Sequence, residues 1–175
     1  GRDEVLVSAG GGAVGMPLFR MALAARQMSR AKDKTWRLLV SRHESPAAIE
    51  ELRKMAGQGV IIEPARPDFP GMLRHCLLSI SKAGYNTVME TLASGARAVV
   101  IPFAGGEETE QSLRASLLAE RGLLEMVRET DLSPETLAAA VDRALDRTPS
   151  PAARIRLDGA DETVRLVRSF LAERR

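Results

Sequence analysis

The chain has 175 residues, of which 45% are apolar, and its 25 basic and 23 acidic side chains give a net charge of +2. This is the composition of an ordinary globular domain, with no dense basic tract or aromatic platform of the kind that binds nucleic acid. The single cysteine excludes an internal disulfide framework and a zinc site built from several cysteines. No apolar run approaches the roughly 18 residues of a membrane span.

Six short apolar runs recur along the chain, and they predict six strands. Their residues are mostly apolar at consecutive positions, which is typical of strands buried on both faces of a parallel sheet. The runs lie at residues 5–7, 36–40, 60–62, 77–80, 98–101 and 123–127.

Helical patterns occupy the segments between these runs. Ser45-Pro46 and Ser133-Pro134 each resemble an N-cap followed by proline in the first turn, and Gly95 and Gly122 suit positions just past helix ends. Asp158-Gly159 introduces a last helix whose apolar residues share one face. The alternation predicts an α/β fold, a three-layer, Rossmann-like, doubly wound parallel sheet with two helices at the end.

A glycine-rich loop follows the first predicted strand and reads Ser8-Ala9-Gly10-Gly11-Gly12-Ala13-Val14-Gly15. Glycines let backbone N–H groups approach an anion closely, and the helix that follows adds the positive end of its dipole. The loop therefore indicates contact with a phosphate or diphosphate; the alternative is a tight strand-to-helix turn. It lacks the Gly-Lys-Ser/Thr of a P-loop, and no acidic residue closes the second predicted strand, where Val40-Ser41-Arg42 stands, so an NAD site is disfavoured.

A second loop follows the fourth predicted strand and leads into a helix that carries Glu90. A carboxylate there can accept two hydrogen bonds from a vicinal diol such as a ribose. The alternative is an ordinary first-turn glutamate that complements the helix dipole.

A third loop follows the fifth predicted strand, where Pro102 ends the strand and Gly105-Gly106 precedes a polar helix start. Gln111 can hydrogen-bond sugar hydroxyls. The alternative is a solvated acidic helix start, which accounts for Glu107 and Glu108 as surface residues.

The remaining reactive side chains are few. His43, His75 and Cys76 do not form a pattern typical of a metal site or a nucleophile, and Cys76 lies beside a predicted buried strand, where it suits a small core residue. Trp36 is expected in the core. We expect neither a metal nor a cofactor.

At these loops the sequence resembles the carboxyl-terminal, nucleotide-sugar-binding domain of GT-B glycosyltransferases. It is most similar to family 28, the MurG family, which transfers N-acetylglucosamine to the lipid-linked peptidoglycan precursor. The resemblance covers roughly residues 4 to 145 and is most specific in Ser81-Lys82-Ala83-Gly84-Tyr85-Asn86-Thr87-Val88-Met89-Glu90, Ala98-Val99-Val100-Ile101-Pro102-Phe103 and Gln111.

The resemblance implies a residue set for a nucleotide-sugar. It places the diphosphate at the glycine loop, the ribose on Glu90, the donor sugar on Gln111 or Glu110, and the uracil on backbone near Ala65 and Arg66, where the family usually has an apolar residue. The full set is Gly10, Gly11, Gly12, Ala65, Arg66, Gly84, Tyr85, Asn86, Thr87, Glu90, Gly105, Gly106, Glu110 and Gln111.

The resemblance also implies a function for the whole protein. Residues 1–147 are expected to bind a UDP-sugar for inverting hexosyl transfer in a metal-independent reaction. The loop and helix of residues 148–175 are expected to pack on this domain or on an amino-terminal one. Because the chain opens at Gly1 and enters a strand at once, we expect it to be a piece of a longer bacterial protein.

The amino-terminal domain would hold the acceptor, which is lipid-linked or a sugar, and the catalytic base. The piece alone is therefore expected to be inactive, and the whole protein is expected to be cytoplasmic or peripheral at the inner face of the membrane. Two alternatives remain: a UDP-sugar epimerase or hydrolase of the same fold, and a non-catalytic nucleotide-sugar-binding subunit that needs a partner.

Overall fold

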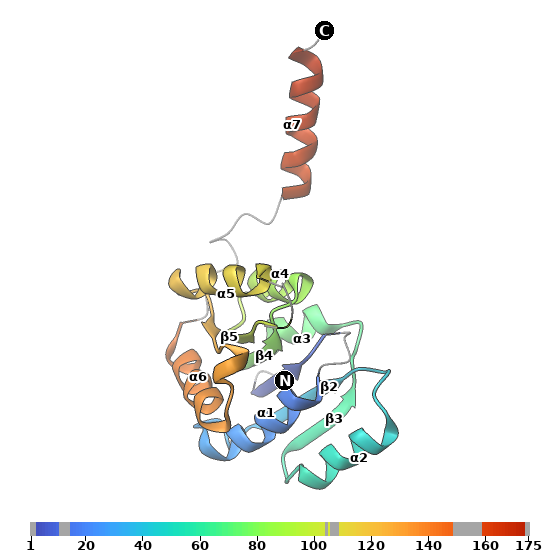
Figure 1. The fold of residues 1–175 in the computed structure, drawn as a ribbon, viewed down its shortest axis with the longest axis vertical. Coiled ribbons are helices and arrows are strands. Elements are labelled where there is room, and N and C mark those ends of the chain that lie inside the picture. The colour runs from blue at the N-terminus through green and yellow to red at the C-terminus, as the bar shows by residue number, and fades with distance from the viewer. Residues whose placement is uncertain (1–2, 11–14, 104, 106–108, 149–158, 174–175) are drawn as a thin grey trace.

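The computed structural model describes residues 3–10, 15–103, 105, 109–148 and 159–173 (Figure 1). Helices and strands alternate through most of these residues. The strands are β1 (Glu4–Ser8), β2 (Thr35–Val40), β3 (Val60–Pro64), β4 (Leu78–Lys82), β5 (Ala98–Ile101) and β6 (Glu125–Met126). The helices are α1 (Met16–Met28), α2 (Pro46–Met55), α3 (Phe69–His75), α4 (Tyr85–Ser94), α5 (Glu110–Glu120), the short 3-10 helix η1 (Glu129–Asp131), α6 (Pro134–Asp146) and α7 (Gly159–Glu173).

The strands form one parallel sheet in the order β3-β2-β1-β4-β5-β6. The chain builds outward from β1 to β3, then returns to the other side of β1 to begin β4. The strand order therefore reverses between β1 and β4, where Ser8 is in register with Ser81. In open α/β sheets a ligand-binding crevice forms at such a reversal, outside the carboxyl ends of the strands.

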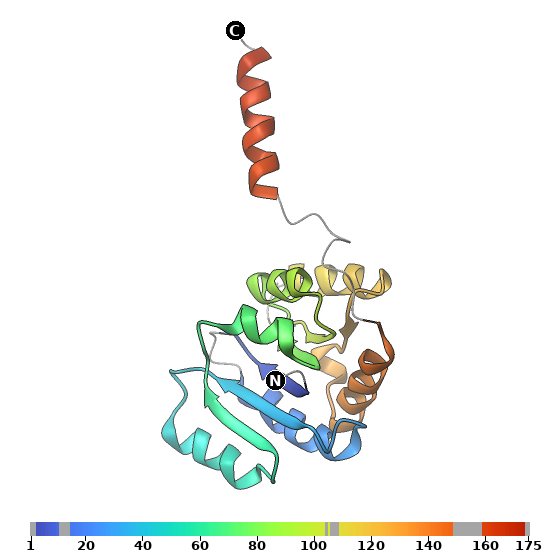
Figure 2. The same ribbon diagram turned by 180° about the vertical axis from the view of Figure 1, so that it is seen from behind.

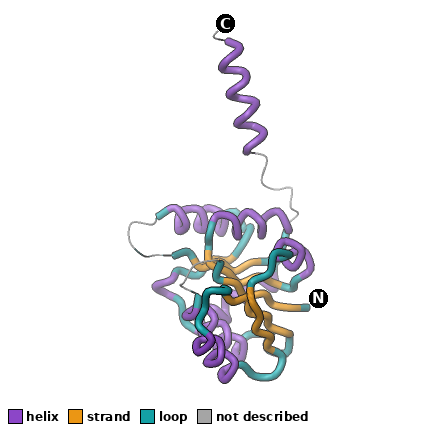
Figure 3. Tube along the Cα trace, turned by 90° about the vertical axis from the view of Figure 1, so that its right-hand side faces the viewer, coloured by secondary structure: helices purple, strands orange, loops and turns teal. Residues whose placement is uncertain are grey.

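Helices cover both faces of this sheet, as Figures 1 and 3 show. On one face, Leu18 and Phe19 of α1 and Val141 of α6 pack with the strand residues Val5 and Trp36 in the larger buried core. On the other face a second core joins α4 and α5 to β5. The predicted three-layer, doubly wound parallel sheet is confirmed, and so is the burial of Trp36, which is 0% exposed.

The helix-start signals in the sequence also act as predicted. The Ser45 side chain accepts a hydrogen bond from the Ala48 N–H at the start of α2. Ser133 forms a reciprocal capping box with Thr136 at the start of α6. Gly95 ends α4 with a φ of 68°, in the left-handed region that favours glycine.

Five of the six strands differ from their predicted ranges by one or more residues, and the differences at β4 and β6 have a clear physical cause. β4 continues through the polar pair Ser81 and Lys82, beyond the predicted end at Ile80, because these residues pair with β1 and β5. The last strand is limited to Glu125 and Met126, which are in register with β5, and the Val127 N–H adds one hydrogen bond to the Val100 carbonyl. Backbone pairing, which hydropathy does not report, sets both boundaries.

The last helix, α7, stands apart from the sheet domain in Figures 1 and 2. Its large apolar side chains are between 50% and 59% exposed: Val164, Leu166, Val167, Phe170 and Leu171. Among the helices described, none is both long and apolar enough to cross a membrane.

Candidate functional site

A cavity of about 290 Å³ lies at the carboxyl ends of the strands, where the strand order reverses. Its position follows from the fold, because the end of β1, the residues after β3 and the first turns of α4 meet at this edge. The lining residues are Ser8, Gly10, Leu39, Ala65, Arg66, Pro67, Phe69, Pro70, Thr87 and Glu90. The cavity thus brings together five residues predicted from the sequence: Gly10, Ala65, Arg66, Thr87 and Glu90.

The cavity has two chemically different ends. On the side of β2, the β3–α3 connection and the start of α3, the lining is largely apolar, with Leu39, Pro67, Phe69 and Pro70 beside the charged Arg66. On the side of β1 and α4 it is polar, with Ser8, Gly10, Thr87 and Glu90. This suits a ligand with a flat apolar part and a hydroxyl-rich or anionic part.

Glu90 supplies the carboxylate of the polar end. It is half-buried and lies one turn after Thr87, so both side chains face the cavity from one side of α4. Within the described part of the chain, the carboxylate has no hydrogen-bond or ion-pair partner. Glu90 is the sixth residue of α4, and the first turn holds no acidic residue. The first-turn alternative therefore does not fit this position.

Buried serine hydroxyls lie beneath the polar end. Ser8 lines the cavity, and its register neighbour on β4 is Ser81. The Oγ atoms of Ser8, Ser79 and Ser81 are buried and have no hydrogen-bond partner among the residues described. An unpaired buried hydroxyl costs free energy, so a polar ligand group at Ser8 would relieve that cost.

Two glycines shape the entry to α1. Gly10 has a φ of 71°, a conformation that a residue with a side chain rarely adopts. At Gly15, the N-cap of α1, an added Cβ would lie 2.7 Å from the Ala9 Cβ and 3.0 Å from the Phe19 ring. The close approach of the loop to α1 therefore requires glycine. Gly11 and Gly12 lie outside the described residues.

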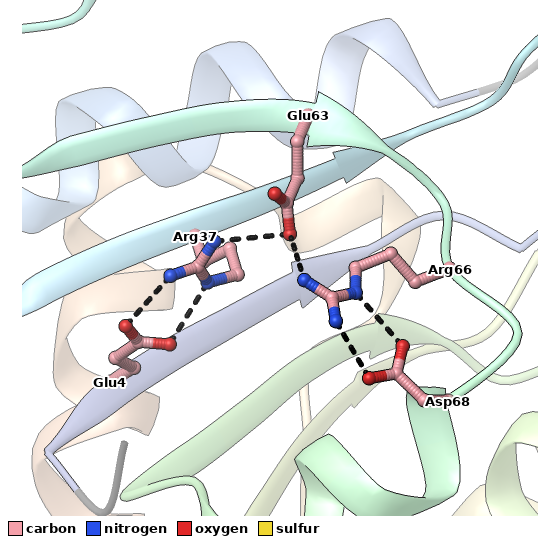
Figure 4. A network of polar contacts seen from close by, with 5 residues as sticks. All are labelled: Glu4, Arg37, Glu63, Arg66 and Asp68. Carbon is pink, nitrogen blue, oxygen red and sulfur yellow. Dashed lines mark hydrogen bonds and ion pairs between the residues drawn. The ribbon is translucent and has the colours of Figure 1, made fainter.

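A chain of charged side chains runs from the sheet to the cavity wall, as Figure 4 shows. Glu4 accepts two hydrogen bonds of 2.9 Å from Arg37, and Arg37 Nη1 lies 3.0 Å from Glu63. Glu63 also lies 3.6 Å from Nη1 of Arg66, whose Nε and Nη2 donate to Asp68 at 2.8 and 2.7 Å. Carboxylates and guanidinium groups alternate, so each holds the next.

These contacts shift the pKa values of Glu4, Arg37, Arg66 and Asp68. Hydrogen bonds from Arg37 hold the pKa of Glu4 below its ordinary value, and hydrogen bonds to Glu4 and Glu63 raise the pKa of Arg37. The Arg66 guanidinium likewise lowers the pKa of Asp68, whose carboxylate raises the pKa of Arg66. All of these groups are therefore charged at neutral pH.

Other predicted site residues are not among the described residues that line this cavity. The Gln111 Oε1 accepts a hydrogen bond of 3.2 Å from the Phe103 N–H, which ties the start of α5 to the end of β5. Glu110 pairs with Arg114, whose guanidinium lies 5.3 Å from the centre of the Tyr85 ring.

The remaining predicted residues lie around the starts of α4 and α5. Gly84 is the N-cap of α4, Tyr85 and Asn86 are exposed on its first turn, and Gly105 lies in the loop before α5. Gly106 lies outside the described residues.

Sequence reasoning missed half of the cavity wall: Ser8, Leu39, Pro67, Phe69 and Pro70. The apolar members carry no chemical signal, and they meet only because β2 and the β3–α3 connection are neighbours. The run Pro67-Asp68-Phe69-Pro70, directly after Ala65 and Arg66, is a proline-rich turn at a strand end. This run was the one indication in the sequence that these residues line a cavity.

The thiol of Cys76 is not an activated nucleophile. Burial raises its pKa to about 11, and its Sγ donates to the Leu73 carbonyl. The His75 ring makes a 2.8 Å hydrogen bond to the Gly71 carbonyl. The described residues hold no group of three or more His, Cys, Asp or Glu side chains able to bind a metal ion.

A model of the glycosyltransferase family 28 C-terminal domain matches residues 12–165. The chain belongs to this family. A curated relative from Brucella anthropi, named UDP-N-acetylglucosamine--N-acetylmuramyl-(pentapeptide) pyrophosphoryl-undecaprenol N-acetylglucosamine transferase, is 33% identical over 140 residues. That match covers 78% of this chain and 37% of the relative. A Brucella melitensis protein of the same name is 28% identical over 163 residues, 90% of this chain and 43% of that protein. The chain thus spans about two fifths of these relatives.

Solved structures show the same fold. The MurG crystal structure from Acinetobacter baumannii superposes with a TM-score of 0.72 at 17% identity, over 94% of this chain and 49% of that one. Os79 from O. sativa in complex with UDP superposes with a TM-score of 0.66 at 20% identity, over 83% of this chain and 32% of that one. The family 28 domain described here is therefore a GT-B glycosyltransferase domain with a MurG-like, Rossmann-like fold.

Proposed function

We propose that this family 28 domain is the donor-binding part of a glycosyltransferase and that it holds a UDP-sugar for inverting hexosyl transfer. The observation that carries the proposal is the two-ended cavity at the strand-order reversal. A nucleoside diphosphate has the same two parts, a flat base and a polar ribose-diphosphate. The free Glu90 carboxylate lies at the end where a ribose diol would be.

Departure of the nucleoside diphosphate leaves negative charge on the leaving group, and this charge has to be stabilised. The N-terminus of α1 faces the carboxyl edge of the sheet directly after the glycine loop, and its dipole favours an anion there. Gly10, in the loop that leads to this helix start, lines the same cavity as Glu90. Diphosphate beside Gly10 and ribose beside Glu90 are therefore compatible with one bound nucleotide.

The donor sugar would extend beyond the diphosphate toward α5. Gln111 and Glu110 remain the proposed sugar contacts, and their side chains already bond Phe103 and Arg114. A bound sugar would therefore have to share or displace those bonds. Gly84, Tyr85 and Asn86 at the start of α4 and Gly105 before α5 stay in the proposed binding set.

The acceptor and the catalytic base are proposed to lie on a part of the whole protein that this chain does not contain. The Brucella relatives bear names that specify an undecaprenol-linked acceptor, which supports a lipid-linked acceptor here too. A lipid-linked acceptor would bring the whole enzyme to the inner face of the membrane. The chain alone would then bind donor without transferring its sugar.

Calorimetric titration of the chain with UDP tests donor binding, and absence of heat at millimolar UDP would contradict it. Incubation with UDP-N-acetylglucosamine and no acceptor tests turnover, since the proposal expects no release of UDP. Steady release would instead identify a hydrolase.

Replacing Glu90 tests the ribose contact. If its carboxylate accepts charge-assisted hydrogen bonds from the ribose, Glu90→Ala weakens UDP binding by about 1.5–3 kcal/mol. The wild type should also prefer UDP to 2′-deoxy-UDP, and the variant should lose that preference. Glu120→Ala, at an exposed position at the end of α5, is the matched control. Unchanged affinity and preference in Glu90→Ala would remove this assignment.

A further inference from the structure

We propose that Arg66 is a specificity-determining residue of the donor site, whose guanidinium plane, held by Asp68 and Glu63, stacks on the nucleobase. This inference rests on the proposed nucleotide function. It gives the side chain of Arg66 a role at the position where the resemblance implied backbone contact alone.

The backbone places Arg66 at the apolar end of the cavity. The Ala65 N–H donates to the Val40 carbonyl at 2.8 Å, so pairing with β2 continues one residue past the end of β3. Arg66 is the next residue, and it lines the cavity together with Pro67 and Phe69. Its side chain is 45% exposed, which leaves part of it available to a ligand.

The contacts of the guanidinium favour stacking over hydrogen bonding. Nε and Nη2 both donate to Asp68, in the two-pronged geometry that fixes the plane of an arginine head group. Nη1 faces Glu63 at 3.6 Å. Because the edges of the group are directed at carboxylates, its flat faces are what it offers to a ligand. Guanidinium faces stack on aromatic rings, including nucleobases.

The charge chain behind Arg66 makes this platform rigid before any ligand arrives. Glu63 is held by Arg37, which donates two hydrogen bonds to Glu4, and the side chains of these three are only 17–25% exposed. An arginine already fixed in this way loses little further conformational freedom when a base stacks on it.

The same contacts argue against attraction between the charge of Arg66 and the diphosphate as the main role of Arg66. Asp68 and Glu63 flank the Arg66 cation, so their charges offset its field toward a diphosphate. The contribution of Arg66 should therefore follow the aromaticity of the base and the planarity of the side chain. Lysine, which keeps the charge and lacks the plane, should not replace it.

The test compares UDP with 5,6-dihydro-UDP, which keeps the carbonyl and N–H groups of uracil and loses its aromatic plane. Calorimetry is done on the wild type, Arg66→Lys and Arg66→Gln, with Arg74→Gln on α3 as the matched control outside the cavity lining. Thermal melts establish that each variant is folded. We expect the wild type to bind UDP about fivefold more tightly than dihydro-UDP. Both Arg66 variants should lose about that factor for UDP and bind the two ligands equally.

Two results would overturn the inference separately from the proposed function. If the wild type binds UDP and Arg66→Lys binds it equally well, Arg66 either acts through its charge alone or does not contact the ligand. The stacking proposal is then wrong. If the wild type binds both ligands equally, the base is not stacked. If the wild type does not bind UDP at all, the proposed function fails and this inference fails with it.

Discussion

The serine hydroxyls of β1 and β4 show that the same residue type can have different roles at two positions. Ser8 and Ser79 both have a buried Oγ without a partner among the described residues, yet only Ser8 lines the cavity. Within a layer of apolar side chains, such hydroxyls reduce stability. A hydroxyl at the cavity floor can recover that loss by bonding a ligand, and Ser79 has no such access.

This difference predicts that two similar substitutions have the same effect on stability but different effects on ligand binding. Ser8→Ala and Ser79→Ala should each leave the free energy of unfolding unchanged or raise it by up to about 1 kcal/mol, measured by urea denaturation. Only Ser8→Ala should weaken UDP binding, by about 1 kcal/mol in calorimetry. A clear loss of stability in Ser79→Ala would mean that its hydroxyl is hydrogen-bonded in solution.

At the scale of the elements, the charge chain links three strands at one side of the sheet. Glu4 belongs to β1, Arg37 to β2 and Glu63 to β3, and the parallel register brings them onto the same face. The pKa of Glu4 is lowered by Arg37, so the interaction stabilises the fold when Glu4 is ionised. Its contribution is present above the ordinary pKa of glutamate and is lost as pH falls through the lower pKa of the folded state.

The pH dependence of the stability difference between Glu4→Gln and the wild type tests this contribution. At pH 7 the variant should be less stable than the wild type by about 1 kcal/mol, because a partly buried two-pronged ion pair is lost. The difference should shrink as pH falls from about 5 toward 3, where the wild-type carboxyl becomes protonated. Urea titrations at several pH values measure it, with Glu50→Gln on the exposed face of α2 as control. A difference independent of pH would contradict the ionic origin.

The secondary structure could be predicted from the sequence more completely than the candidate site. Consecutive apolar runs and the Ser-Pro starts of α2 and α6 predicted the sheet and its helices, because burial and capping leave local patterns. Glu90 and Thr87, which line the cavity, were predicted because they lie in the segment where the family resemblance is most specific. The charge chain was not found, since Glu4 and Arg37 are 33 residues apart and meet only through the strand register.

At the scale of the whole molecule, α7 differs from the other α-helices that the structure describes, each of which has buried side chains. Its apolar side chains are exposed, whereas those of α6 form part of the main core. The predicted division after residue 147 stays a proposal: residues 148–175 would pack on this domain or on an amino-terminal one. The exposed apolar face of α7 supports a partner outside the sheet domain.

Removing residues 149–175 tests this division. Because α7 contributes none of the buried residues of either core, the melting temperature of the shortened chain should stay within about 2 °C of the full chain. UDP affinity should be unchanged, since no residue of α7 lines the cavity. A fall of more than about 5 °C in a thermal scan would instead mean that α7 packs on the sheet domain in solution.

The β3–α3 connection and the first two residues of α3 supply Ala65, Arg66, Pro67, Phe69 and Pro70 to the cavity. Of residues 65–70 only Asp68 is not part of the lining, and it accepts hydrogen bonds from Arg66. The preference of this domain for one nucleobase would then be determined by this one short segment, which is separate from the segments that bind ribose and diphosphate. The sequence of such a segment can change in evolution, or be exchanged between homologues by protein engineering, without disturbing the sheet to which it is attached.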